Sequence, residues 1–388
     1  MSDMSNPFDG LLGDLLKIIG GQGGSTPWLD SAKALAVNVA TGDEPEGNVD
    51  PLDRMAFEQV GPIVTLHVAE LVGSPLAPVT VEPITRAAWA LAQLQAWTPM
   101  VEQVVAAQSA ATGQSMAQFS EEGEGLIPPI LGQFAAMLGP MMLGLQFGSA
   151  AGHLAERALG SYALPLPWPE HTPTYVVPRN VASFANDWSL PLDDVRLFVA
   201  TREIAGAVSL GTPSIARRVT ELLQSAMTEA LANQASVIER LSGSGDPEAL
   251  QAMLSDPESI LAELVIPATS TSSASLTAAT TALAAFLDHL ATTVTSRLTL
   301  SHSLITEAWR RHRTTDAKGE QSAGSLFGLD LSAGEVDRGA KFVAGVLDRA
   351  GNEGLAKLVA DGNNLPTPAE LDAPGLWLER IALAELEP

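Results

Sequence analysis

The segment between residues 124 and 156 contains no aspartate, glutamate, lysine or arginine, and this restricts the folds that the chain can adopt. An uncharged stretch of this length is long enough to cross a bilayer. It also carries three glycines at a spacing that lets helices approach closely: Gly144, Gly148 and Gly152. Two proline-containing breaks, at Pro128-Pro129 and Gly139-Pro140, leave no uninterrupted helix of about 20 residues. We therefore expect a buried helical hairpin, with a membrane-associated span over Leu126–Leu154 as the alternative.

The composition indicates a folded, acidic protein. Hydrophobic residues make up 46% of the 388 residues and charged residues only 17%, which predicts a substantial core. Aspartate and glutamate number 45 against 21 lysines and arginines, so the formal net charge is −24. Because such a surface repels phosphate backbones, we expect no nucleic-acid partner. The short basic run Arg310-Arg-His-Arg313 fits the solvated C-terminal end of a helix better than a nucleic-acid contact.

Cysteine is absent, which excludes a disulfide framework and a cysteine-ligated metal. The first residues, MSDMSNPFDG, lack the basic and then apolar pattern of a signal peptide, so we expect a cytoplasmic location. His289 and His302 fall on one predicted helix, more than three turns apart, and would lie too far from each other to share a metal.

Capping signals and apolar spacing predict a mainly α protein with one small β-sheet. Helices are expected at Trp28–Ala40, Asp50–Leu71, Ile84–Gln114, Ile215–Leu241, Leu276–Arg313, Ala333–Asp361 and Pro368–Leu386. Two Asp-Pro pairs predict further helix starts, at Asp246 and Asp256. We expect an interruption at Pro99 and a polar break over Thr269–Ser275. The five prolines of Tyr162–Pro178 predict an extended connector that enters a short strand at Thr174–Val177.

These elements divide the chain into three predicted regions. Residues 1–30 are rich in glycine and serine and are expected to form a flexible N-terminal arm. Residues 31–125 form an N-terminal helical region that ends in an acidic, glycine-containing loop. Residues 126–388 form a second, larger helical domain.

The stretch Leu197–Gly211, LFVATREIAGAVSLG, follows a polar start in which Asp193 and Asp194 are expected as N-cap and first-turn residues. It predicts a helix over residues 193–209. In the zinc-protease pattern HExxH, two histidines on one helix face bind zinc and the glutamate beside the first is the general base. The five positions here read Arg202-Glu203-Ile204-Ala205-Gly206. Glu203 is retained as a vestigial general base, and both ligand positions are replaced.

Further segments carry a wider likeness: Asn6-Pro-Phe8, Met137–Pro169, Val176–Ala200, Leu326–Leu331, Arg338–Leu358 and Leu365–Ile381. In this order they resemble the zincin-like metallopeptidase type 2 family, a group of bacterial proteins often labelled hydrolases. The resemblance covers most of the chain and is weakest across Glu221–Ala274. It implies a zincin-like helical architecture for residues 126–388.

The resemblance also implies a second helix, which in the family reads Glu-Gly-Tyr-x-Asp-His and supplies the third zinc ligand. The matching stretch here is Ala284-Ala-Phe-Leu-Asp-His289, so the ligand position has become Ala284 while Asp288 and His289 remain. Arginine offers no lone pair to a metal, and glycine and alanine have no ligand atom in their side chains. With Arg202, Gly206 and Ala284 at the three ligand positions, we expect no zinc and no other cofactor.

Two geometric expectations follow from the resemblance. The helices at 193–209 and 276–313 should pack side by side, because the family's ligands come from both. In the family, the aspartate that Asp288 matches accepts the N–H of the first histidine and orients it. Arg202 stands at that histidine position, so we expect an ion pair between Arg202 and Asp288. An exposed Arg202, or one that pairs with Glu203 or Asp194, is the alternative.

Three functions are compatible with these residues. The first is a catalytically inactive zincin-like scaffold that binds a protein or peptide partner in a groove. The second is an active metallopeptidase-like hydrolase with non-standard ligands, for example Glu203, Asp288 and His289. The third is a membrane-associated protein that uses the uncharged span, and the proline breaks make it the least favoured. We favour the first, and the sequence specifies neither the partner nor the oligomeric state.

Overall fold

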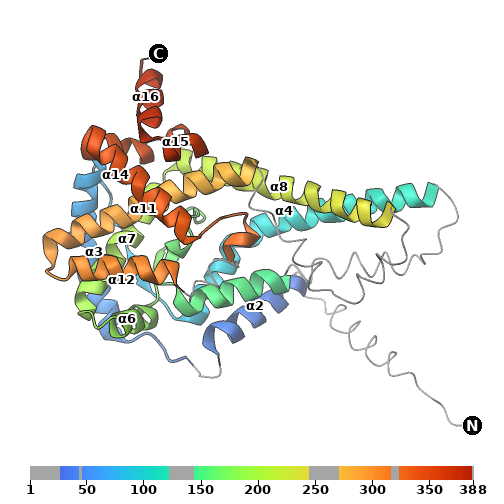
Figure 1. Cartoon of the computed structure of the whole chain (residues 1–388). Helices are drawn as coiled ribbons and strands as arrows, with labels where there is room; N and C mark the ends of the chain where they lie inside the picture. Colours follow the sequence, from blue (N-terminus) through green and yellow to red (C-terminus); the bar gives the residue numbers. More distant parts are fainter. Residues whose placement is uncertain (1–26, 43–45, 122–143, 244–270, 316–322, 387–388) are drawn as a thin grey trace, which may run out of the picture.

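A computed structural model describes residues 27–42, 46–121, 144–243, 271–315 and 323–386. Over these residues the protein is mainly helical with one two-stranded sheet, as the sequence predicts. A helical body carries a long projection in which α4 (Arg86–Glu121) and α8 (Pro213–Gly243) run side by side (Figure 1). Most of the predicted N-terminal arm, the part of the uncharged span before residue 144, and both Asp-Pro helix starts lie outside the described residues.

α11 (Thr271–Leu298) forms the centre of the body. It packs against α7 (Leu192–Leu210), α8 and α14 (Ala333–Ala356), and it also contacts α3 (Pro51–Val72). Its buried residues are largely alanine and threonine, which let the neighbouring helices approach closely. The remaining elements are α2 (Pro27–Thr41), α6 (Pro178–Asp187), α12 (His302–Thr314), α15 (Pro368–Asp372), α16 (Pro374–Ala384) and the 3-10 turns η1 (Ser161–Ala163), η2 (Lys357–Val359) and η3 (Gly362–Asn364).

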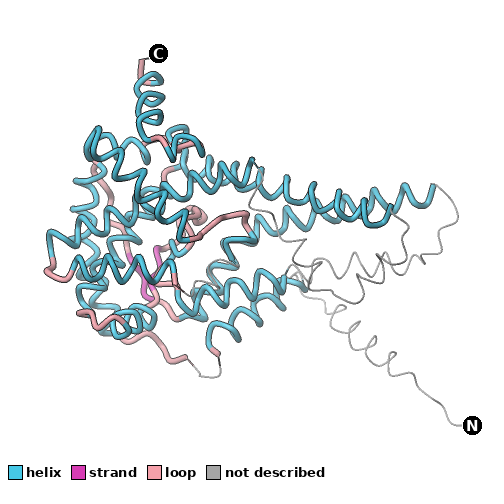
Figure 2. Tube along the Cα trace, viewed as in Figure 1, coloured by secondary structure: helices cyan, strands magenta, loops and turns pink. Residues whose placement is uncertain are grey.

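The small sheet lies inside the body, beside α7 (Figure 2). β1 (Val81–Pro83) and β2 (Thr174–Val176) pair in parallel, and β2 is the strand that the sequence predicts. Val176 of β2 also forms an antiparallel bridge with Gly160, just before η1. The sheet therefore fixes the position of η1, which supplies main-chain groups to the site described below.

Gly144, Gly148 and Gly152 of the uncharged segment lie on a helix at residues 144–157 that packs against α2. A Cβ atom on Gly148 would lie 2.5 Å from the carbonyl oxygen of Ala32, and a Cβ atom on Gly144 would lie 2.7 Å from that of Trp28. The expected close approach of two helices is thus present, and the partner is α2. No helix among the described residues is long and apolar enough to cross a membrane.

The predicted single helix over 276–313 is wrong. α11 ends at Leu298, and α12 starts at His302 after a short turn, so the chain reverses direction. The predicted polar break at Thr269–Ser275 is also wrong for its described part, because α11 begins at Thr271. The hydroxyl of Ser275 donates to the Thr271 carbonyl at 3.1 Å, so this polar side chain finds its acceptor within the helix.

Other helix ends differ from the prediction as well. α4 continues through Pro99 without ending there. The N-cap of α7 is Pro191, and both Asp193 and Asp194 lie in the first turn. The helix expected to reach Asp361 ends at Ala356, after a kink at Gly351 where φ is 63°. The expected C-terminal helix consists of two helices, α15 and α16.

Candidate functional site

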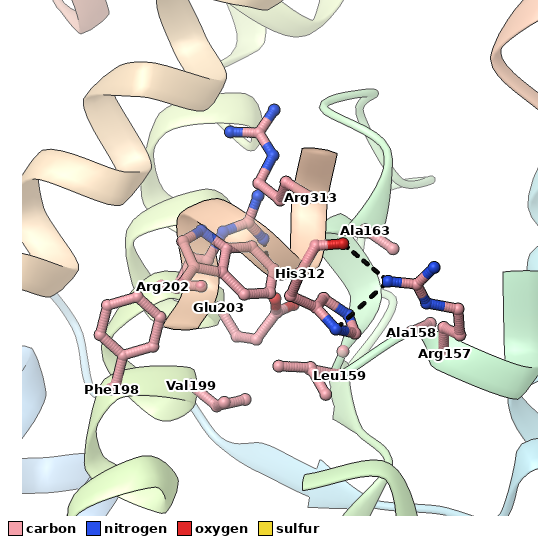
Figure 3. Close-up of a pocket in the computed structure, with 12 residues that line it drawn as sticks. Arg157, Ala158, Leu159, Ala163, Phe198, Val199, Arg202, Glu203, His312 and Arg313 are labelled. Carbon is pink, nitrogen blue, oxygen red and sulfur yellow. Dashed lines mark hydrogen bonds and ion pairs between the residues drawn. The ribbon is translucent and has the colours of Figure 1, made fainter. Parts of the chain in front are cut away.

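The site lies where α7 packs against α11, and this contact between the two predicted ligand helices confirms the first geometric expectation. α7 contributes Arg202 and Glu203, which are only 4% and 1% exposed. α11 contributes Asp288, and α12 folds back over it with Trp309 and Arg313. Figure 3 labels Arg202, Glu203 and Arg313 of this cluster. The result is a buried cluster of charged groups in the interior of the body.

Arg202 bonds to three groups at once. Its Nε donates to Asp288 Oδ1 at 3.0 Å, so the predicted ion pair is present. Its Nη1 donates to the Tyr162 carbonyl at 2.8 Å and to Glu203 Oε1 at 3.3 Å, so the alternative pairing with Glu203 is also present. The guanidinium lies 4.8 Å from the centre of the Trp309 ring, a cation–π distance. Arg202 therefore joins both retained carboxylates.

Asp288 is saturated with donors. Besides Arg202, the Trp309 indole donates to its Oδ1 at 2.9 Å and Arg313 Nη1 donates to its Oδ2 at 2.5 Å. Burial alone would raise the pKa of Asp288, but the charges of Arg313 and Arg202 outweigh it and hold that pKa below its usual range. Asp288 is thus an ionised carboxylate with both oxygens engaged.

Glu203 is enclosed on all sides by the protein. Its Oε2 accepts the Tyr162 N–H at 2.9 Å and its Oε1 accepts Arg202 Nη1. A Cβ atom on Gly160 would lie 2.4 Å from the carboxyl carbon of Glu203, so only glycine fits there. Burial raises the pKa of Glu203 to about 7, against the opposing charge of Arg202 and the hydrogen bond from Tyr162.

The other two replaced positions are filled differently. A Cβ atom on Gly206 would lie 2.3 Å from the Tyr162 ring, which covers this part of α7. Tyr162 is buried, and burial followed by the charge of Glu203 raises its pKa. Ala284 is buried and borders a separate cavity of about 10 Å³ together with Arg313 and Glu335. Neither position 206 nor position 284 therefore offers a side-chain atom that could bind a metal.

His289 does not join the cluster. Its Nε2 lies 3.5 Å from the Thr293 hydroxyl, and burial lowers its pKa against a hydrogen bond with Asn352. In the described ranges, no three His, Asp or Glu side chains are grouped so that they could hold a metal. The proposed non-standard set of Glu203, Asp288 and His289 is therefore wrong. His289 and His302 also lie on different helices, contrary to expectation.

A cavity of about 20 Å³ remains beside Arg202. Arg157, His312 and Arg313 border it together with Glu203 and Trp309, as Figure 3 shows for the labelled residues. Its volume corresponds to roughly one water molecule. The donor set does not suit zinc, because three of these side chains are guanidinium groups and only one is a carboxylate.

The sequence matches the zincin-like metallopeptidase family over residues 29–378. The chain belongs to that family. A solved structure, titled as a "putative hydrolase with a novel fold" from Chloroflexus aurantiacus, is similar in fold, with a TM-score of 0.57 and 19% sequence identity. The similarity covers 91% of this chain and 98% of that one. No curated protein matches this zincin-like chain significantly.

Several residues of this zincin-like site were not predicted from the sequence. The basic run 310–313 was expected to be solvated, and Arg310 and Arg311 do lie on the surface, where they pair with Glu307. Arg313, however, is only 14% exposed and binds Asp288. Tyr162 was assigned to a connector without a role. A polar start at Ser301, in the middle of the predicted long helix, was the available signal for α12.

Proposed function

We propose that this chain is a non-catalytic member of the zincin-like family that binds a protein or peptide partner. The main support for the proposal is the buried guanidinium of Arg202. It donates hydrogen bonds to both carboxylates that remain from the family pattern, Asp288 and Glu203. A glutamate acts as general base in this chemistry on a metal-activated water within hydrogen-bond reach. Glu203 instead accepts hydrogen bonds from Tyr162 and Arg202, so both of its carboxyl oxygens are engaged by the protein.

A large open groove supports the binding part of the proposal. It has a volume of about 970 Å³ and lies between α4, α8 and the proline-rich connector that follows η1. That volume is at the upper end of the range for ligand pockets. Apolar and aromatic side chains form much of its wall, among them Trp97, Met100, Leu166 and Trp168, and Arg217 and Glu221 add opposite charges. Such a wall suits a peptide with apolar side chains.

The cluster of Arg202, Glu203 and Asp288 supports one wall of this groove through Tyr162. The tyrosine borders the groove, while its ring covers Gly206 and its main chain bonds to Arg202 and Glu203. Trp168, also in the groove wall, donates from its indole to the Ser161 carbonyl at 2.9 Å. The former catalytic helices therefore hold the groove wall in one position, which lowers the entropic cost of binding a partner.

Metal content and proteolysis test the loss of catalysis. We expect the dialysed full-length protein to retain far less than one zinc per chain by elemental analysis. We also expect Glu203→Ala to leave any residual peptide hydrolysis unchanged, because no metal-bound water depends on this carboxylate. Stoichiometric zinc, or proteolysis that a chelator abolishes, would contradict the proposal.

A matched pair of α8 variants tests the groove. Thr220 and Thr228 are both exposed on α8, and each hydroxyl donates to the carbonyl four residues earlier, but only Thr220 borders the groove. Peptides selected from a random library against the wild-type protein should bind Thr220→Arg at least tenfold more weakly and Thr228→Arg with equal affinity, measured by fluorescence anisotropy. Equal binding to both variants would place the peptide elsewhere.

A further inference from the structure

The outer face of α3, at the left of the body in Figure 1, is apolar although the opposite face of this helix is already buried in the core. Four large apolar side chains on the outer face are between 50% and 74% exposed: Leu52, Met55, Ile63 and Leu66. Together with Gln59 they form one stripe along the helix, the α3 stripe, because three and four residues separate neighbours on a helix face. The inward face carries Phe57, Gly61, Val64, Thr65, Val68 and Leu71. A helix that is apolar on both faces is usually covered on both, and an exposed apolar face marks a contact surface.

The α3 stripe has the same spacing in both directions. Leu52 and Leu66 lie seven residues to either side of Gln59, and Met55 and Ile63 lie four residues to either side. A second copy that is rotated about a twofold axis through Gln59 would bring an antiparallel α3 against this face. Leu52 would then contact Leu66 of the second copy, and Met55 would contact Ile63. A twofold interface requires this self-complementarity, because residue i contacts residue j and j contacts i.

The residue at the centre of the α3 stripe also suits an identical partner. Gln59 would face Gln59 of the second copy on the twofold axis. A side-chain amide can pair with an identical amide, because it holds both donors and an acceptor. A charged residue at this position would instead repel its copy. The polar centre of the stripe therefore favours a second copy of this chain as the occupant.

The charges around the α3 stripe cancel, although the chain carries a formal net charge of −24. Each carboxylate of α3 has an arginine close by: Asp53 pairs with Arg196, Glu70 pairs with Arg297, and Glu58 follows Arg54 by one turn. Two copies can therefore meet along α3 without net repulsion between these groups. A membrane is a poorer occupant, because helices that lie on phospholipid surfaces are rich in basic residues on their polar face. α3 contains one arginine and no lysine.

We propose that the α3 stripe is a dimer interface, in which α3 packs antiparallel against α3 of a second copy of this chain. From Leu52 to Leu66 the contact spans about 21 Å at 1.5 Å per residue. The Arg297–Glu70 ion pair places the exposed Leu298, at the end of α11, near one end of the stripe, where it can extend the contact. A single helix face is smaller than the interface of about 800 Å² per partner that is typical of stable complexes. We therefore expect a dimer that dissociates in the micromolar range. α3 does not line the large groove, so the inference does not depend on the proposed function.

Sedimentation velocity of the full-length protein over a concentration series tests the dimer. The mass should change from that of a monomer to that of a dimer as the concentration rises. Leu66→Glu should weaken dimerisation at least tenfold, because the new carboxylate would face Leu52 of the second copy. Leu383→Glu is the matched control, since Leu383 is also an exposed leucine but lies on α16, and this variant should dimerise like the wild type. Circular dichroism verifies that both variants fold.

Three outcomes of this experiment would overturn the inference. The first is a wild-type protein that stays monomeric at every concentration, and the second is a dimer that Leu66→Glu leaves unchanged. The third is a monomer that binds phosphatidylcholine vesicles through Leu66, which would assign the α3 stripe to a membrane. Zinc content and peptide binding are separate measurements, so failure of the dimer and failure of the proposed function are distinguishable.

Single cysteines test the geometry of the pair, because the chain contains no cysteine of its own. Gln59→Cys should form a disulfide-linked dimer on mild oxidation, since helix axes about 8–10 Å apart bring two central Cβ atoms within disulfide reach. Glu58→Cys is the control, because this exposed neighbour points about 100° away around the helix and should stay unlinked. Leu52→Cys and Leu66→Cys should link to each other when the two variants are mixed, and neither should link to itself. Equal linking of Gln59→Cys and Glu58→Cys, or linking of Leu52→Cys to itself, would contradict the antiparallel arrangement.

Discussion

A guanidinium at position 202 differs from an imidazole in two respects that matter here. It carries a permanent charge, and its planar fork can donate to several acceptors at once. Arg202 uses both properties, because it neutralises Asp288 and Glu203 and also fixes η1 through the Tyr162 carbonyl. With arginine at the position of the family pattern's first histidine, both remaining carboxylates are bonded to a cation inside the protein.

Asp288→Ala should destabilise the protein by about 3 kcal/mol, because it leaves Arg202 and Arg313 without their shared carboxylate in a largely buried cluster. Asp372→Ala is the matched control. Asp372 also pairs with an arginine, Arg338, but its side chain is 61% exposed, so we expect a loss under about 1 kcal/mol. Urea unfolding at constant salt gives both values. Equal losses in the two variants would show that the cluster is not buried in solution.

The raised pKa of Glu203 predicts that the free energy of unfolding decreases as the pH rises. The folded state keeps the Glu203 carboxyl protonated up to about pH 7, whereas the unfolded state loses that proton near the ordinary pKa of glutamate. The contribution of Glu203 to stability therefore falls as the pH rises between these two pKa values. Relative to Glu203→Gln, the wild type should lose roughly 2–3 kcal/mol between pH 4.5 and 7.5.

The control for this pH series is Glu370→Gln. Burial opposes ionisation of Glu370, but the hydrogen bond from Arg380 prevails and keeps its pKa below the ordinary value. Its stabilising contribution is present above that ordinary value and is lost only in more acidic solution, so the difference from the wild type should stay flat from pH 5 to 8. If the difference in unfolding free energy between the wild type and Glu203→Gln were similarly flat, the prediction that burial disfavours the charged form of Glu203 would be wrong.

At the site, the sequence predicted the Arg202–Asp288 pair because both residues lie on long helices whose contact the family resemblance implied. Tyr162 and Gly160 could not be predicted in the same way. They reach Glu203 only because β2 and the indole of Trp89 hold the main chain at Gly160, and both contacts are distant in sequence. Local patterns contain no information about such contacts.

Among the elements, the turn between α11 and α12 decides which residues reach the site. On one straight helix, Asp288 and Arg313 would be about 37 Å apart at 1.5 Å per residue. The reversal after Leu298 brings them into contact instead. The turn contains neither glycine nor proline, so the usual breaking signals were absent. Conversely, Pro99 was expected to interrupt α4, yet the helix continues, since packing overrides the local preference.

The contact between α2 and the helix at residues 144–157 depends on glycine at position 148. A Cβ atom there would lie 2.5 Å from the Ala32 carbonyl oxygen, and backbone cannot move aside as a side chain can. Gly148→Ala should therefore destabilise the protein by roughly 1–3 kcal/mol. Gly61→Ala in α3 is the control, because the nearest atom lies at an ordinary 3.7 Å and alanine favours a helix by up to about 1 kcal/mol.

Thermal or urea unfolding of the two glycine variants distinguishes close packing from mere helix propensity. If Gly148→Ala were as stable as the wild type, or more stable in the manner of Gly61→Ala, α2 would not be docked on this helix. The comparison also tests the interpretation of the uncharged segment, because a docked helix explains its glycines without a membrane.

For the molecule as a whole, the predicted regions 31–125 and 126–388 share structural elements. β1 comes from the first region and β2 from the second, and they form one sheet. α3, from the first region, packs on α7 and α11, from the second. Arg196 on α7 also pairs with Asp53 on α3. Neither region buries these surfaces without the other, so the division drawn from the sequence is not expected to be a folding boundary.

We therefore predict that the two regions unfold together. In native-state hydrogen exchange followed by mass spectrometry, peptides from α3 and from α11 should open with the same free energy as urea increases, because separating α3 exposes the buried side chains of Phe57, Val64 and Val68. Peptides from the exposed end of α16, which packs only at the edge of the body, serve as the internal control and should exchange at lower urea. Opening of α3 well before α11 would instead make residues 31–125 an independent unit, and the sheet would then contribute little to cooperativity.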